Sequence, residues 1–101
     1  MSKPPSFDFS GKVAFVTGAG SGIGRATALA FAAAGASVAI VDISDAGLKE
    51  TEGQIIALGA KVLSMRCDVT KSAEIKSALD QTIAAFGRLD AAFNNAGIEQ
   101  P

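Results

Sequence analysis

The chain has 101 residues, which is enough for one domain with a small core. Nine basic residues balance ten acidic ones and are scattered along the chain, so the composition argues against nucleic-acid binding. The longest apolar run, residues 28–34, is shorter than the roughly 20 residues that cross a bilayer, and a single cysteine excludes an intrachain disulfide and a cysteine-rich metal site.

Residues 1–10 contain no apolar segment of the kind that secretory signals carry, and we expect them to form a flexible leader of a cytoplasmic protein. An apolar strand at residues 13–17 then runs into a glycine-rich loop and an alanine-rich helix. The first N–H groups of a helix are unpaired and carry partial positive charge, so they can bind a diphosphate. Gly18 suits the turn, Gly22 a close approach to the ligand, and Gly24 close packing of helix and strand.

The helix after the glycines is expected to end at Gly35 and to bury one face of mostly small residues, which comprises Ile23, Ala26, Ala30, Phe31 and Ala34. Arg25 is its only charged residue. A second strand at residues 37–42 ends in Asp42, and a second helix is expected to begin after Ser44 as N-cap and to end at Gly59. That helix is predicted to pack through Leu48, Ile55 and Leu58.

A third strand is predicted at residues 61–67, and the lone Cys67 at its end is interpreted as a packed thiol. A third helix is expected to have Thr70 as N-cap and to end at Gly87. Its apolar stripe consists of Ile75, Leu79, Ile83 and Phe86. A fourth strand is predicted at residues 89–93, with Asp90 at its start in a structural role.

Strands that alternate with helices predict an α/β fold with a parallel sheet. Right-handed crossovers place the first two helices on one face of the sheet. If the third crossover returns past the first strand, the strand order is 3-2-1-4, and the third helix covers the opposite face. The glycine loop and residues 94–97 would then meet at a switch point, where open α/β sheets bind cofactors.

The spacing of Thr17, Gly18, Gly22 and Gly24 follows the pattern T-G-x-x-x-G-x-G. With Asp68-Val69 and Asn94-Asn95-Ala96-Gly97, it resembles the short-chain dehydrogenase/reductase family over residues 11–97. The resemblance implies a partial, truncated Rossmann-type dinucleotide-binding domain over residues 11–101. The expected cofactor-binding residues are Gly18, Ser21, Gly22, Ile23, Gly24, Asp42, Asp68, Val69, Asn95, Ala96 and Gly97.

Asp42 lies near the position at which an acidic side chain meets the adenosine ribose, and its charge would repel a 2′-phosphate, so the sequence favours NAD over NADP. In the family, the aspartate of the Asp68-Val69 motif lies beside the adenine amino group. Local alternatives remain open for each motif. Asp42 can be a turn residue or helix cap, Asp68 can organise the turn before Thr70, and residues 94–97 can form a polar turn.

The family transfers hydride between a nicotinamide and an alcohol or ketone, through a downstream Ser and a Tyr-x-x-x-Lys pair, and the resemblance implies a homo-oligomer in its complete form. This chain contains no tyrosine and no histidine, so no catalytic residue is assigned and we expect the chain alone to be inactive. The alternatives are a stand-alone dinucleotide-binding module and a fragment that completes its sheet with another polypeptide. A sugar-nucleotide epimerase is disfavoured, because its T-G-x-x-G-x-x-G loop would need glycine at position 21.

Overall fold

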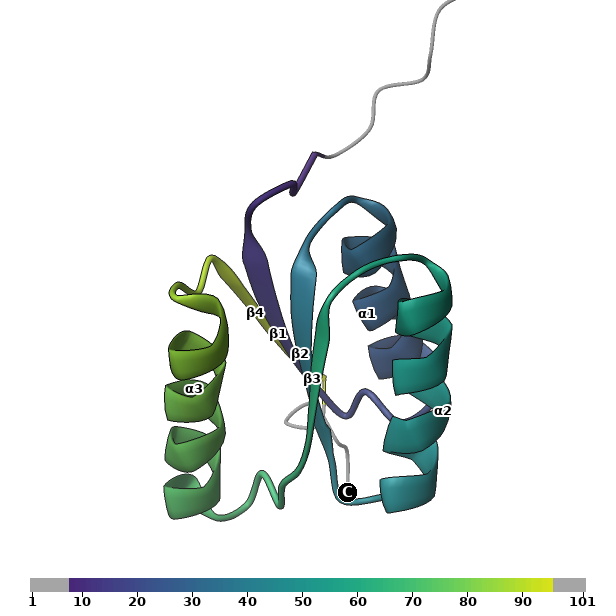
Figure 1. Ribbon diagram of the computed structural model, residues 1–101. Coiled ribbons are helices and arrows are strands. Elements are labelled where there is room, and N and C mark those ends of the chain that lie inside the picture. Colours follow the sequence, from purple (N-terminus) through teal and green to yellow (C-terminus); the bar gives the residue numbers. More distant parts are fainter. Residues whose placement is uncertain (1–7, 96–101) are drawn as a thin grey trace, which may run out of the picture.

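The structure is a computed structural model that describes residues 8–95, in which four strands alternate with three helices. The elements are β1 (Val13–Thr17), α1 (Gly22–Ala33), β2 (Ser37–Asp42), α2 (Asp45–Ala57), β3 (Val62–Arg66), α3 (Ser72–Phe86) and β4 (Ala91–Asn94). All strand pairs are parallel, and the sheet order is β3-β2-β1-β4 (Figure 1). The predicted fold class and strand order are therefore confirmed.

The sheet lies between two helical layers, with α1 and α2 on one face and α3 on the other (Figure 1). One core cluster joins β1 and β2 to α1 and α2 through side chains such as Val16, Ile40 and Ile55, which are fully buried. The second joins the opposite face of the same strands to Ala78 of α3. Within residues 8–95, no helix has the length and hydropathy needed to cross a bilayer.

The register brings the carboxyl ends of the central strands together. Thr17, the last residue of β1, pairs with Val41 of β2 on one side and with Asn94 of β4 on the other. The strand order reverses between β1 and β4, and the helix that follows β1 (α1) and the helix that precedes β4 (α3) lie on opposite faces of the sheet. This is the switch point expected from the sequence, and it lies at the lower end of the sheet in Figure 1.

Most predicted helix ends are confirmed. The Ser44 hydroxyl accepts a hydrogen bond of 3.1 Å from Gly47 N–H at the start of α2. Gly35, Gly59 and Gly87 follow or end the three helices with positive φ, between 82° and 102°. The N-cap predicted at Thr70 is wrong, because the cap residue of α3 is Lys71, and the Thr70 hydroxyl instead donates to Asp68 Oδ1 at 2.7 Å.

The buried face of α1 differs from the prediction. Gly24, Ala28 and Ala32 are buried, whereas Ile23 is 65% exposed and Ala26 and Ala30 are also exposed. The smallest residues face β1 because the helix packs directly against the backbone there, which leaves no room for an isoleucine side chain. The periodicity identified the helix, and Phe31 packs against the first core cluster as predicted, but the buried stripe runs through Ala28 and Ala32 rather than through the other predicted positions.

Two further apolar residues that were predicted to pack against the sheet are solvent-exposed. Leu58 is 51% exposed because it lies at the C-cap of α2, where the helix ends and the chain turns toward β3. Ile83 is 47% exposed, because the part of α3 that contacts the sheet is centred on Ala78 and Thr82. Leu48 and Ile55 of α2 are buried as predicted, and Ile75, Leu79 and Phe86 of α3 pack against the second core cluster.

At the opposite end of the sheet from the switch point, Asp90 has the structural role predicted for it. Its Oδ2 accepts from Val13 N–H at 2.8 Å, and its carboxylate forms an ion pair of 2.7 Å with Arg88. Phe9, inside the expected leader, packs edge-on against the Phe31 ring at 5.2 Å between centroids. Phe9 therefore contacts the helix α1; residues 1–7 lie outside the described residues.

Candidate functional site

The glycine loop leaves β1 at Gly18 and enters α1 with Ser21 as the N-cap residue. Gly18 has a φ of 62°, a backbone conformation that residues other than glycine rarely adopt, so Gly18 supplies the turn as expected. A Cβ on Gly24 would overlap the Gly18 carbonyl and lie 3.1 Å from Ala19 Cα. Gly24 is thus the point at which the backbone of α1 touches the loop backbone directly after β1. Nothing lies within 4 Å of the corresponding position on Gly22, so that residue faces open space.

The start of α1 offers unpaired donors beside this open space. The first hydrogen bond of the helix runs from Arg25 N–H to the Ser21 carbonyl at 3.2 Å, so the N–H groups of Gly22, Ile23 and Gly24 precede it. Ser21 makes no side-chain cap bond, and Ile23 is exposed. The loop therefore presents backbone N–H groups, the positive end of the helix dipole and one apolar side chain to the carboxyl end of the sheet.

Asp42 lies next to the glycine loop at the end of β2. Its Oδ2 accepts from Gly20 N–H at 2.8 Å, and its Oδ1 accepts from Ser44 N–H at 3.0 Å. The second bond is the local turn role that the sequence left open, whereas the first connects the carboxylate directly to the loop. A carboxylate has about four acceptor positions, so these two bonds leave capacity for further donors.

Asp68 follows β3 and organises the turn that leads into α3. Its Oδ1 accepts from both the Thr70 N–H, at 3.0 Å, and the Thr70 hydroxyl, at 2.7 Å. These hydrogen bonds, the hydroxyl bond foremost, lower the pKa of the Asp68 carboxyl. The local alternative for Asp68 is thus observed. The observed bonds involve one oxygen of an exposed carboxylate, so they are compatible with a ligand at the other.

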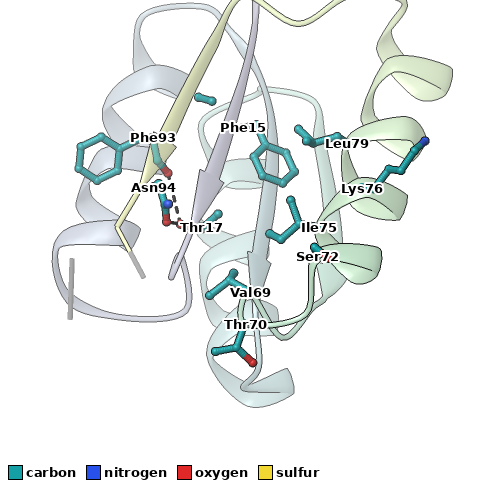
Figure 2. Close-up of a pocket in the computed structure, with 11 residues that line it drawn as sticks. Phe15, Thr17, Val69, Thr70, Ser72, Ile75, Lys76, Leu79, Phe93 and Asn94 are labelled. Atoms are coloured by element: carbon teal, nitrogen blue, oxygen red, sulfur yellow. Dashed lines mark hydrogen bonds between the residues drawn. The ribbon is translucent and has the colours of Figure 1, made fainter. Parts of the chain in front are cut away.

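A groove of about 550 Å³ lies between α3 and the carboxyl ends of β1 and β4. Phe15, Ile75 and Leu79 form its apolar floor, Val69 lies at one end, and Lys76 points outward at its rim (Figure 2). Polar groups of β1 and β4 line the same groove. The Thr17 hydroxyl donates to Asn94 Oδ1 at 2.9 Å, and this hydrogen bond ties the two strands together.

The structure therefore brings most of the predicted residues to one end of the sheet. The glycine loop and Asp42 lie on the α1 and α2 face, and Val69 and the end of β4 lie across the sheet from them. Asn95 directly follows β4, and the predicted residues Ala96 and Gly97 lie outside the described residues.

Four residues that the sequence reasoning did not assign to the site also take part in it. Gly20 belongs to the loop itself, and Arg25, Gly47 and Thr51 lie against the loop. Two signals were available: Arg25 is a single charge in an apolar helix, and Thr51 falls between Leu48 and Ile55 on the buried stripe of α2.

Comparison with known proteins identifies the family to which the chain belongs. The profile of the short chain dehydrogenase family matches residues 12–101, which is most of the chain. The chain belongs to the short-chain dehydrogenase family. It is 50% identical over 93 residues to a 2,5-dichloro-2,5-cyclohexadiene-1,4-diol dehydrogenase of Sphingobium indicum, covering 92% of this chain and 36% of that relative.

Solved structures of short-chain dehydrogenases agree with this membership. A hydroxysteroid dehydrogenase from Escherichia coli superposes with a TM-score of 0.83 at 38% identity, over 86% of this chain and 37% of that one. A short chain dehydrogenase/reductase from Burkholderia phymatum in complex with NAD superposes with a TM-score of 0.81 at 38% identity, over 85% and 31%. The chain thus spans about a third of the length of the relatives it matches.

Proposed function

We propose that this short-chain dehydrogenase chain binds NAD in preference to NADP and forms the cofactor-binding part of an oxidoreductase that acts on small alcohols or ketones. The observation that carries the proposal is the position of Asp42, whose carboxylate hydrogen-bonds the glycine loop at Gly20. A carboxylate here can accept the hydroxyls of an adenosine ribose, and it repels the 2′-phosphate of NADP.

The two basic side chains nearest Asp42 support the preference for NAD. Arg25 donates to the Thr51 hydroxyl and to the carbonyls of Gly20 and Gly47. Arg66, the register partner of Asp42 on β3, donates to the Ile43 carbonyl at 3.1 Å. Both guanidinium groups already donate to acceptors of the chain, and Arg66 also pairs with Asp45 at 3.9 Å, so a 2′-phosphate would have to compete with these contacts.

The residues present fit a dinucleotide. Gly24 lets α1 approach the glycine loop closely, because a Cβ at this position would overlap the Gly18 carbonyl. The first N–H groups of α1 remain available to a diphosphate, and Asp42 lies beside them at the end of β2. In this proposal Gly18, Ser21, Gly22, Ile23 and Gly24 hold the diphosphate side of the cofactor. Asp68 and Val69 hold the adenine side, and Asn95, Ala96 and Gly97 contact the nicotinamide ribose side. A bound nicotinamide supplies the acceptor or donor of hydride.

The test is titration of the chain with NADH and NADPH by calorimetry. Hydrogen bonds to a charged group contribute about 1.5–3 kcal/mol, so we expect NADH to bind at least about tenfold more tightly. Asp42→Asn should narrow this ratio. Glu50→Gln removes the same charge from an exposed position on α2 and should leave the ratio unchanged. Equal or tighter binding of NADPH by the wild-type chain contradicts the proposal.

The chain contains neither tyrosine nor histidine, so we propose that it catalyses no hydride transfer by itself. A panel of small ketones with NADH, monitored at the NADH absorbance, tests this. Turnover that persists through purification to constant specific activity would show that a proton donor is present in this chain after all.

One observation favours the second candidate, a fragment that completes its sheet with another polypeptide. Within residues 8–95, β4 pairs with β1 alone and is therefore an edge strand, to which a further strand could be added. Sedimentation velocity tests this second candidate. A chain that only binds the dinucleotide stays monomeric as its concentration rises, whereas a chain that completes its sheet with another polypeptide associates.

A further inference from the structure

Arg25 links the start of α1 to the start of α2 beneath the glycine loop. Its Nε donates to Thr51 Oγ1 at 2.8 Å, and its Nη2 donates to the carbonyl oxygens of Gly20 at 2.5 Å and of Gly47 at 3.3 Å. The side chain is half-buried, although the helix that carries it is otherwise apolar. A guanidinium is suited to this role because its donors diverge in a fixed plane.

Every backbone polar group of Ala19 and Gly20 has a partner on this side of the loop. Ala19 N–H donates to a carbonyl of β2 at 3.1 Å, and its carbonyl accepts from the buried Thr51 hydroxyl at 2.7 Å. Gly20 N–H donates to Asp42 Oδ2, and its carbonyl accepts from Arg25. Both peptide units that flank the Gly20 Cα are therefore held, one by the Asp42 carboxylate at the Gly20 N–H and the other by the Arg25 guanidinium at the Gly20 carbonyl.

The packing around these bonds leaves little room for rearrangement. A Cβ on Gly47 would lie 2.5 Å from the Gly20 carbonyl oxygen, and a Cβ on Gly20 would lie 2.8 Å from Asp42 Oδ2. The loop and the start of α2 thus meet backbone to backbone. A change at Arg25 reaches the Asp42 carboxylate through the backbone of one residue, Gly20, whose carbonyl contacts Arg25 and whose N–H contacts Asp42.

We propose that Arg25 is a positioning residue of the cofactor site. It keeps the Gly20 N–H directed at Asp42 and neutralises the partial negative charge of the Gly20 carbonyl, which would otherwise lie beside an anionic diphosphate. In this proposal Arg25 does not touch the cofactor and acts on it only through the glycine loop and Asp42. This inference rests on the proposed NAD binding and adds a residue that sets its strength and selectivity.

The decisive variant is Arg25→Lys, which keeps the positive charge but replaces the planar fork by a single ammonium group. Calorimetric titration is done at a temperature at which circular dichroism shows each variant to be folded. We expect Arg25→Lys to weaken NADH binding about threefold and to narrow the preference for NADH over NADPH. Arg25→Gln, which also loses the charge, should weaken NADH binding about tenfold. Lys49→Gln, an exposed charge on α2, is the matched control and should bind as wild type.

The outcomes separate the two proposals. Absence of NADH binding by the wild-type chain refutes the proposed function, and this inference with it. Wild-type binding of NADH with unchanged dissociation constants in Arg25→Lys refutes the positioning role alone, even if the unfolding midpoint falls, because that pattern describes a residue that only stabilises the fold. If Arg25→Gln does not fold, the comparison of Arg25→Lys with Lys49→Gln still decides the question.

Discussion

Replacement of Gly24 by alanine tests the contact on which the glycine loop depends. An added Cβ would overlap the Gly18 carbonyl oxygen and approach the Gly18 carbonyl carbon to 2.5 Å and Ala19 Cα to 3.1 Å. All three atoms belong to the backbone, so no side-chain rotation can relieve the overlap. The helix must instead move away from β1, which opens the core that Val16 and Ala28 share.

The magnitude follows from two opposing terms. Overpacking of a close contact costs about 1–3 kcal/mol, and a rigid backbone neighbour places Gly24→Ala at the upper end of that range. Replacing glycine by alanine within a helix returns about 1 kcal/mol. We therefore expect the free energy of unfolding to fall by about 1–2 kcal/mol, with the unfolding temperature lowered by about 4–8 °C for each kcal/mol.

Gly53→Ala is the matched control, because Gly53 lies within α2 with nothing inside 4 Å of its added Cβ. The same substitution there should raise the free energy of unfolding by up to about 1 kcal/mol. Urea unfolding followed by far-ultraviolet circular dichroism measures both variants. If Gly24→Ala is as stable as the wild-type chain or more stable, α1 does not pack on β1 as closely as described, and the role given to this glycine is wrong.

Three further predictions concern polar and thiol groups. The Arg88 guanidinium and the Val13 N–H lower the pKa of Asp90. The ionised Asp90 carboxylate therefore stabilises the fold at pH values above the ordinary carboxyl pKa, and this stabilisation is lost as the pH falls through the lowered pKa. The difference in unfolding midpoint between wild type and Asp90→Asn should vanish in strong acid, and a difference that does not change with pH would contradict the ion pair. Burial raises the pKa of the Cys67 thiol, so Ellman's reagent should label it only after urea unfolding, whereas rapid labelling of the folded chain would place it at the surface. Thr51→Val should cost about 1–3 kcal/mol in unfolding free energy because it leaves a buried carbonyl unpaired, whereas Thr51→Ser, which keeps the hydroxyl, should cost less; equal losses would show that packing matters there rather than the hydrogen bonds.

Local sequence patterns predicted the architecture well, for a physical reason. Strand and helix periodicities, the cap at Ser44 and the glycines that end the helices depend on neighbours a few residues away. The strand order followed because right-handed crossovers leave few arrangements of four parallel strands. The turn at Gly18 and the close packing at Gly24 were also predictable, since only glycine allows them.

Other features were decided by the tertiary structure alone. The buried stripe of α1 is set by how closely the helix approaches β1, which favours Ala28 and Ala32 over the larger Ile23. No sequence pattern shows that Arg25 meets Thr51, because that contact requires α1 and α2 to lie side by side at the Gly20 carbonyl. The sequence by itself thus determined the order of elements and the glycine loop, because these follow from local sterics and periodicity. The tertiary structure decided which side chains support that loop, because those contacts exist only once separate elements are packed together.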